Sequence, residues 1–178
     1  MEDKILDINE KNQQLKIVPY YLKFGLIAVF ISIIFSMIIY FVGLEFERKY
    51  QYMNSLVPIV LVVLCLVNYK QDNGNRLKGN TGFTMGFLMF LFYGIAIGLF
   101  TILYVSVISP DFIEGIKEVT IEQMKTRGLD DEMIATQMRY ASFFFSPAWF
   151  FIVSVLMNVI MGLIVSGITA AIMKTPQH

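Results

Sequence analysis

The sequence predicts an all-α integral membrane protein with four transmembrane helices and an amphipathic helical hairpin between the third and the fourth. Three observations lead to this fold class. Apolar residues make up 56% of the 178 residues and charged residues only 16%, whereas roughly a quarter of an average soluble domain is charged. The mean hydropathy is +0.63. Four stretches almost free of charge are each about as long as a bilayer core requires.

We expect these stretches to form one membrane domain over residues 1–178, with spans at 20–42, 53–69, 83–109 and 148–173. The only charged side chain within them is Lys23. An unpaired backbone group is costly in hydrocarbon, and the gaps lack the alternation of a β-barrel, so each stretch should be helical. The second is barely long enough to span, and the last two are long enough to tilt. Pro58 is tolerated if it lies in a first helical turn, and otherwise it kinks the helix.

Residues 110–147 form the only sizeable segment outside the four stretches, and we expect a helical hairpin there. Ser109 followed by Pro110 is typical of an N-cap and a first helical turn. Gly128 can adopt the left-handed conformation that ends a helix, and Asp130 can cap the next one. Apolar and charged residues separate onto opposite helical faces. Seven acidic and four basic residues give the hairpin a net charge of minus three.

The distribution of Lys and Arg predicts that both termini face the cytoplasm. With this orientation the cytoplasmic segments hold eight basic residues, and the opposite side holds two in its short loop. The long hairpin segment counts weakly, because long segments translocate with little regard to charge. The eight are Lys4, Lys11, Lys16, Lys23, Lys70, Arg76, Lys78 and Lys174.

Small residues recur at four-residue spacing in the third and fourth stretches. This spacing lets two helix backbones approach closely, so we expect these faces to pack on each other within one chain. Pairing with a second copy or another membrane protein is the alternative. Asn158, the most polar residue deep in a span, should form a hydrogen bond there, with contact to a transported ligand as the alternative. The predicted helix-packing residues are Gly82, Gly86, Gly94, Gly98, Ser154, Asn158, Gly162, Ser166 and Ala170.

The sequence predicts no catalytic, cofactor-binding or metal-binding residues, and therefore no enzyme. The only cysteine, Cys65, lies inside an apolar stretch, and the only histidine, His178, is the last residue. Neither a disulfide nor a thiolate cluster can form within the chain. The 14 basic residues balance the 14 acidic ones without a basic run, which argues against a nucleic-acid partner. The expected partners are the lipid bilayer and a membrane protein or a second copy of this chain.

Short motifs of glycine and aromatic residues lie at the ends of the predicted spans. They are Tyr21-Leu-Lys-Phe-Gly25-Leu-Ile, Gly82-Phe-Thr-Met-Gly86-Phe, Tyr104 with Ser109-Pro110-Asp111-Phe112, and Gly162-Leu-Ile. In these motifs the chain resembles, nearly from end to end, the family named domain of unknown function 4199, which comprises small four-pass bacterial membrane proteins. The resemblance implies a bacterial inner-membrane protein. It supplies no catalytic residue, because the family has no assigned activity.

Two functional classes follow from these observations. The favoured one is a non-enzymatic accessory or structural component that acts by binding, and the alternative is a small oligomeric transporter or channel. Proton relays and ion pathways use intramembrane acidic or basic residues, and polarity in this sequence is concentrated on one span. The hairpin is the surface most varied in chemistry, so its acidic face, with Glu114, Glu118 and Glu122, is the candidate partner surface.

Overall fold

The computed structural model describes residues 2–175, with side chains from Ile17 onward except those of Arg48 and Gln51. Its α-helices are α1 (Glu2–Phe41), α2 (Arg48–Asp72), α3 (Gly79–Leu103), α4 (Phe112–Thr126), α5 (Asp131–Ala141) and α6 (Pro147–Met173). A π-helical turn, η1 (Tyr104–Ile108), continues α3, and a short 3-10 helix, η2 (Ser142–Phe145), precedes α6. Residues 2–175 contain no strand, so the predicted all-α class is confirmed.

Four of these helices are long and apolar enough to cross a membrane, in agreement with the predicted membrane fold. The second helix begins at Arg48, well before its apolar stretch. Pro58 therefore lies in the interior of α2 and not in its first turn, where it has no N–H to offer the carbonyl of Asn54. The candidate spans are Ile17–Phe41, Tyr52–Asp72, Gly79–Ile108 and Pro147–Met173.

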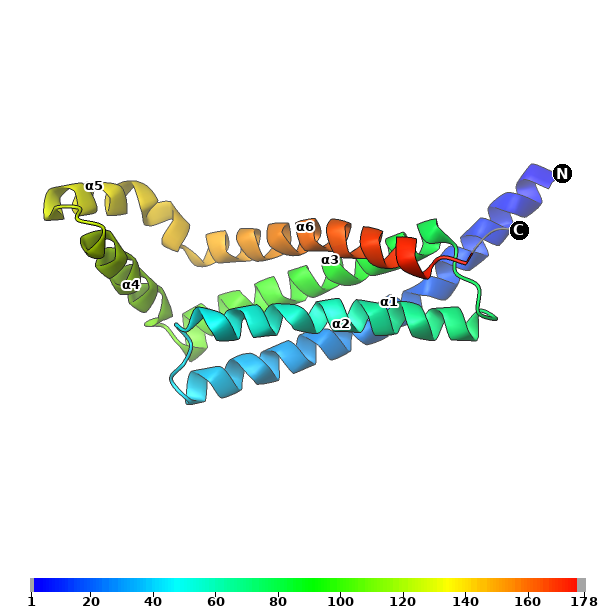
Figure 1. Ribbon diagram of the computed structural model, residues 1–178, viewed down its shortest axis with the longest axis horizontal. Coiled ribbons are helices and arrows are strands. Elements are labelled where there is room, and N and C mark those ends of the chain that lie inside the picture. Colours follow the sequence, from blue (N-terminus) through cyan, green and yellow to red (C-terminus); the bar gives the residue numbers. More distant parts are fainter. Residues whose placement is uncertain (1, 176–178) are drawn as a thin grey trace.

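The four long helices lie side by side, with α3 in the central position (Figure 1). It packs along α6 on one side and along α1 on the other, and α2 packs chiefly on α1. The α4–α5 hairpin projects beyond one end of the bundle, which we call the hairpin end. The start of α1 and the end of α6 lie at the opposite end, which we call the terminal end (Figure 1). The fold thus separates one membrane bundle from one projecting element.

The core of the bundle lies between α1, α2 and α3. Its fully buried side chains interdigitate from these three helices, whereas α6 buries only small residues against α3. None of the large apolar side chains of α6 is buried and eight are exposed, as is typical of a lipid-facing helix. The most buried members of the core are Ala28, Val62, Cys65, Leu66, Met85, Met89 and Phe90.

Hydrogen bonds between distant segments close the terminal end. The Leu77 amide donates to Thr175 Oγ1 at 2.9 Å, and the Thr175 amide donates to the Leu77 carbonyl at 2.9 Å. The Tyr20 hydroxyl donates to Asp72 Oδ2 at 2.6 Å. The segment after α6 and the first part of the α1 span are thereby both fixed to the α2–α3 turn.

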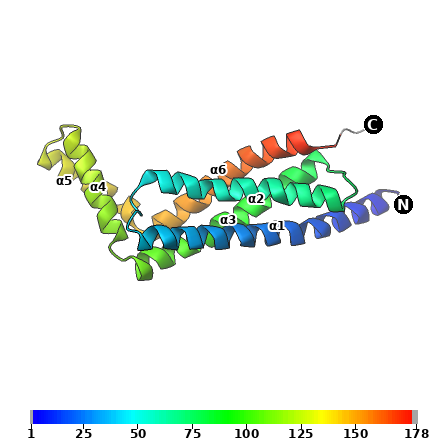
Figure 2. The same ribbon diagram turned by 60° about the horizontal axis from the view of Figure 1, so that its bottom comes forward.

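The turn between α4 and α5 is formed by local capping. Gly128 has a φ of +83°, and the Leu129 amide donates to the Met124 carbonyl at 3.2 Å, as in a Schellman motif. Asp130 then caps α5, because its carboxylate accepts a 2.7 Å hydrogen bond from the Met133 amide. Gly128 and Asp130 therefore take the positions predicted for them. Figures 1 and 2 show α4 leading away from the bundle and α5 returning toward α6.

The start of α4 differs from the expectation. Ser109 is not its N-cap, because α4 begins at Phe112 with Asp111 in the capping position. The Ser109 amide instead donates to the Tyr104 carbonyl at 2.8 Å and so completes the π-helical turn. Pro110 lies in the turn that follows. The wider π-helical ring draws Ser109 into the end of the preceding helix, which displaces the next helix start.

Candidate functional site

A cavity of about 360 Å³ lies at the hairpin end, between α1, α2 and α3 and beneath the start of α4. This volume is near the lower end of the range for small-molecule sites, about 300–1,000 Å³. The wall is mainly aromatic and aliphatic. Its main polar side chains are Ser36, Glu45, Asn54, Thr101 and Tyr104. An apolar wall with a few convergent polar groups is the usual character of a binding site.

The end of α1 turns Glu45 back toward this cavity. Gly43 has a φ of +73°, a conformation that glycine adopts at little cost. The Leu44 amide donates to the Ile39 carbonyl at 3.0 Å, so the helix ends in a Schellman motif. The chain reverses direction there, and Glu45 comes to lie in the cavity wall, where its carboxylate accepts a hydrogen bond from the Tyr104 hydroxyl.

The π-helical turn η1 positions Tyr104, whose hydroxyl donates to Glu45. A π-turn leaves helix carbonyls without their regular partners, and such turns are frequent at functional sites. The carbonyl of Ile108, which lacks a helical partner because the helix ends there, accepts a 3.1 Å hydrogen bond from the Tyr40 hydroxyl. The rings of Tyr40 and Tyr104 meet edge to face, with their centroids 5.9 Å apart. The end of α3 is therefore held against the end of α1 beside the cavity.

Asn54 places an unpartnered polar atom in the cavity wall. Its Nδ2 donates to Ser36 Oγ at 3.3 Å, across the α1–α2 contact. Its Oδ1 is buried and accepts no hydrogen bond from the described residues. An unsatisfied buried polar atom costs about 1–3 kcal/mol. The Thr101 hydroxyl on α3 already donates to the Ile97 carbonyl at 2.9 Å, so its hydrogen is not available to Asn54.

Aromatic rings fix the start of α4 over the cavity. The Phe112 ring stacks on Phe46 at 5.6 Å and meets the edge of Tyr104 at 5.3 Å. Gly115, one turn further on, lies so close to Phe46 that a Cβ would overlap the ring. Aromatic pairs contribute about 0.5–1.5 kcal/mol beyond the area that they bury. The second half of α4 lacks such contacts, and Val119 is 38% exposed.

The predicted small-residue faces of α3 and α6 lie against each other in the structure. Most of these contacts are closer than a Cβ on the glycine would permit. Asn158 packs on Gly94, but its Nδ2 donates to the Ser154 carbonyl at 2.9 Å, so this amide is bonded within α6 and not to α3. The facing pairs are Gly82 with Ala170, Gly86 with Ser166, Gly94 with Asn158, Gly98 with Phe151, and Gly162 with Phe90.

The acidic residues predicted as a partner surface are Glu114, Glu118 and Glu122, and all three are exposed. Their four-residue spacing places them along one face of α4. Glu114 forms an ion pair with Lys117 at 3.0 Å, an exposed contact of the kind that contributes about 0–1 kcal/mol. None of the three lines the cavity, so the candidate partner surface and the cavity are separate features of the hairpin end.

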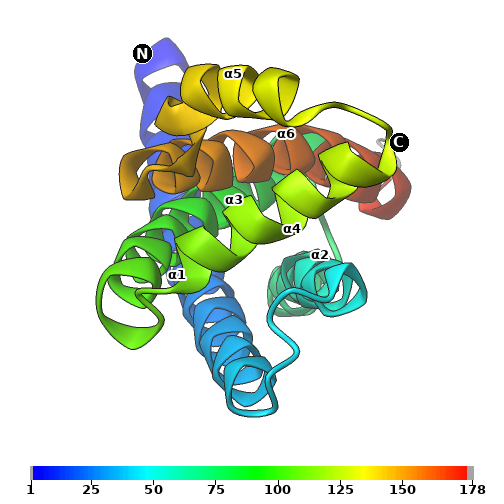
Figure 3. The same ribbon diagram turned by 90° about the vertical axis from the view of Figure 1, so that its left-hand side faces the viewer.

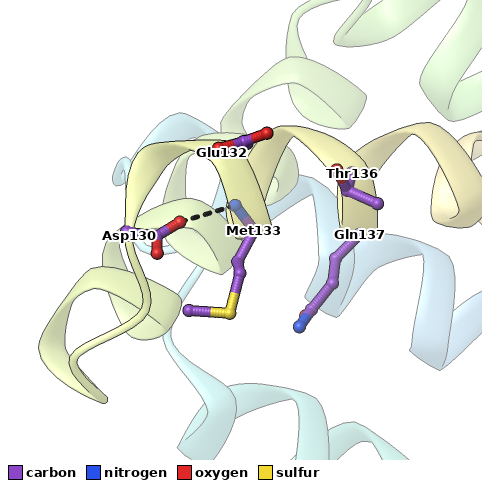
Figure 4. A pocket seen from close by; sticks show the side chains of 5 residues that line it. All are labelled: Asp130, Glu132, Met133, Thr136 and Gln137. Carbon is purple, nitrogen blue, oxygen red and sulfur yellow. Dashed lines mark hydrogen bonds between the residues drawn. The ribbon is translucent and has the colours of Figure 1, made fainter.

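A second hollow, of about 340 Å³, lies beside the start of α5 (Figure 4). Asp130 and the α5 residues Glu132, Met133, Thr136 and Gln137 line it. Figure 4 shows the Asp130 carboxylate turned toward the Met133 amide that it caps. One helix with its cap supplies the whole lining, so no second element encloses a ligand. Among the described residues, no three His, Cys, Asp or Glu side chains gather closely enough to hold a metal ion.

The sequence analysis did not identify the polar residues of the cavity. Ser36, Asn54 and Thr101 are uncharged polar residues within three different apolar stretches, each of which holds other such residues, and Glu45 lies in a short loop. Their one signal is polarity at positions where lipid favours apolar side chains. That signal does not show which of these residues face one another, because the bundle geometry brings them together.

Comparisons with known proteins yield one match. The model of a family described as "Protein of unknown function (DUF4199)" matches residues 23–175. No curated protein and no solved structure matches the chain. The matched residues include the cavity, the hairpin and all four candidate membrane spans, except for the first turns of the first span.

Proposed function

Given that this chain belongs to the DUF4199 family, we propose that it is a bacterial inner-membrane protein, with both termini cytoplasmic, that acts by binding another molecule and not by catalysis. The observation that carries this proposal is where its polar groups lie. They lie at the two ends of the bundle, and at the hairpin end they line the cavity and one face of α4. The long helices below this end present apolar residues to lipid and to one another.

The packing below the cavity favours binding over transport. Ser32 lies one turn below the cavity residue Ser36, and its hydroxyl is bonded to that of Tyr93 at 2.9 Å. Below that pair, Cys65 and Met89 are fully buried. No charged side chain is buried among the residues whose side chains the structure describes. Proton relays and ion pathways use such groups, so a single copy of this chain offers no polar route across the bundle.

The projecting hairpin is the proposed contact surface for a partner. It extends beyond the bundle, as the side views in Figures 1 and 2 show. Glu114, Glu118 and Glu122 give α4 an exposed acidic face, which suits a basic partner. A helix pair of this length is marginal in water by itself, and the exposed Val119 and Met133 leave apolar surface that a partner would cover.

The test replaces residues 115–140 by a short flexible linker and compares what the two forms capture from native membranes in a mild detergent. We expect the shortened protein to insert normally and to lose specific partners. A finer variant, Glu114→Gln with Glu118→Gln and Glu122→Gln, should capture less of the same partners. Lowering the salt concentration should increase capture by the wild type more than capture by this variant. The matched control is Asp131→Asn with Glu132→Gln on α5, which should retain them.

A flux assay separates the proposal from the transporter alternative. The full chain is reconstituted into liposomes loaded with an ion-sensitive or pH-sensitive dye. We expect no flux above that of empty liposomes. Flux that scales with the amount of protein would overturn the binding role, and retention of every partner by the shortened form would remove the hairpin as the contact surface.

A further inference from the structure

We propose that the cavity at the hairpin end binds a single-chain amphiphile from the membrane whose head group donates a hydrogen bond, either a hydroxyl or an ammonium group. This site is separate from the acidic face of α4, so the inference goes beyond partner binding by the hairpin and stands or falls independently of it. The inference depends on three features: which hydrogen-bonding groups of the wall already have partners, how far the apolar part of the wall extends, and how α6 packs on its neighbours.

The polar wall holds a buried hydrogen-bond acceptor that no described residue satisfies. The Tyr104 hydroxyl donates to Glu45, the Thr101 hydroxyl donates to a carbonyl of its own helix, and Asn54 Nδ2 donates to Ser36. These three donors are already used, and the other side-chain donors of the wall are the hydroxyls of Ser36 and Tyr50. Asn54 Oδ1 is buried and accepts no hydrogen bond from the described residues. A hydroxyl or ammonium head group would satisfy this oxygen, whereas an ether oxygen has no hydrogen to donate.

The apolar part of the wall is suited to an alkyl chain. Phe35 and Ile39 lie one turn apart on α1, and Ile97 and Phe100 lie almost one turn apart on α3. The wall therefore extends along the helices, from the polar groups toward the interior of the membrane region. A chain that follows this direction would bury apolar surface on both helices, which favours binding.

The bundle leaves one side on which an amphiphile can reach the cavity from the bilayer. α6 packs along α3, and its contact with α2 is the slightest of any neighbouring pair of long helices. The end-on view shows α2 standing apart from α6 (Figure 3). Phe150 is the one residue of α6 that lines the cavity. We assign this side, between α2 and α6, as the route of access.

The test measures binding of three ligands with the same chain length to the purified full chain in nanodiscs of phosphatidylcholine, a two-chain lipid whose head group donates no hydrogen bond. Dodecanol and dodecylamine carry donor head groups, and 1-methoxydodecane carries only an acceptor. Native mass spectrometry counts the bound molecules. We expect one per chain, and we expect at least one of the donor ligands to bind about three- to tenfold more tightly than the ether, as one net hydrogen bond implies. Which donor binds more tightly identifies the head group as hydroxyl or ammonium.

Three variants of the full chain make this test specific to the cavity. Asn54→Leu removes the acceptor and should abolish the preference for donor ligands over the ether. Asn68→Leu is the matched control, because its amide lies on the same helix and donates to the Leu64 carbonyl at 3.1 Å. It should keep the preference. Thr101→Phe fills the cavity and should abolish binding of all three ligands, and it serves as the second variant if Asn54→Leu does not fold.

Three results would overturn the proposal. The first is equal affinity of the wild type for the ether and both donor ligands. The second is a donor preference that persists in folded Asn54→Leu. The third is absence of any bound ligand at saturating concentration, which would mean that water alone fills the cavity. Neither flux nor partner capture enters these measurements, so their outcome is distinct from that of the proposed partner-binding role.

Discussion

The hydroxyl groups of Ser32 and Tyr93 share a hydrogen bond of 2.9 Å that joins α1 to α3 in the centre of the bundle. Ser32 is fully buried and Tyr93 is 4% exposed. Water does not reach this position to replace a lost partner, so the two groups depend on each other. The pair also closes the interior directly below the cavity residue Ser36.

Breaking this pair should destabilise the bundle by a small, measurable amount. Tyr93→Phe and Ser32→Ala are each expected to cost about 0.5–1.5 kcal/mol. The double variant should cost less than the sum, by about 0.6 kcal/mol, the average coupling of such bonds in a membrane protein. Reversible unfolding in mixed detergent micelles measures all four forms. Strictly additive costs would show that the two hydroxyl groups do not interact.

Close packing of α3 on α6 predicts a strong dependence on side-chain size at Gly162. A Cβ there would lie 2.7 Å from Phe90 Cβ, whereas a Cβ at Gly167, on the same helix, would meet nothing within 4 Å. Gly162→Leu should therefore lower the free energy of unfolding by about 1–3 kcal/mol or more, since overpacking of a core costs this much. Gly167→Leu is the matched control and should have little effect. Equal melting temperatures in detergent for both variants would contradict this contact.

The capping of α5 predicts that Asp130 controls the order of the hairpin. Asp130→Ala removes the acceptor for the Met133 amide and should cost the helix about 1 kcal/mol. Hydrogen exchange should then accelerate in the first turn of α5, with the four long helices unchanged. Gln137→Ala, on the same helix but outside the cap, should leave that exchange rate as it is. Unaltered protection in Asp130→Ala would mean that the cap does not stabilise α5.

The proposed orientation predicts which turns an impermeant thiol reagent can reach in intact cells. Gln71→Cys, an exposed position in the last turn of α2, should be protected, and Thr136→Cys on α5 should react. The wild-type chain is the background, because its only cysteine, Cys65, is buried. Labelling of Gln71→Cys together with protection of Thr136→Cys would show the reverse orientation.

Much of the architecture can be predicted from the sequence, because its causes are local. Long apolar stretches must be helical in a membrane, since each backbone group has to find its partner within the same segment. The left-handed Gly128 and the cap at Asp130 depend on residues within one or two turns, so the turn of the hairpin follows from its own sequence. The helix bounds were less predictable, because α2 extends through the polar residues that precede its apolar stretch.

The π-helical turn and the cavity required the tertiary structure. No pattern in the sequence marks Tyr104–Ile108 as a wider turn. The hydrogen bond that holds its end comes from the hydroxyl of Tyr40, which precedes Ile108 by 68 residues in the chain. The start of α4 lies at Phe112 and not at the predicted Pro110, because the π-helical turn ends only at Ile108 and Ser109 completes it.

The sequence by itself determined that this chain is a four-helix membrane protein with one projecting segment, through composition and local capping. Only the tertiary structure decided which polar residues share a site. Nothing in the sequence separates Ser36, Asn54 and Thr101 from the other uncharged polar residues of the same apolar stretches, such as Ser55, Asn68 and Ser106. Whether such a side chain faces lipid, a neighbouring helix or a cavity depends on how the helices are rotated and how closely they approach. Packing between distant segments sets both, and a local pattern does not encode it.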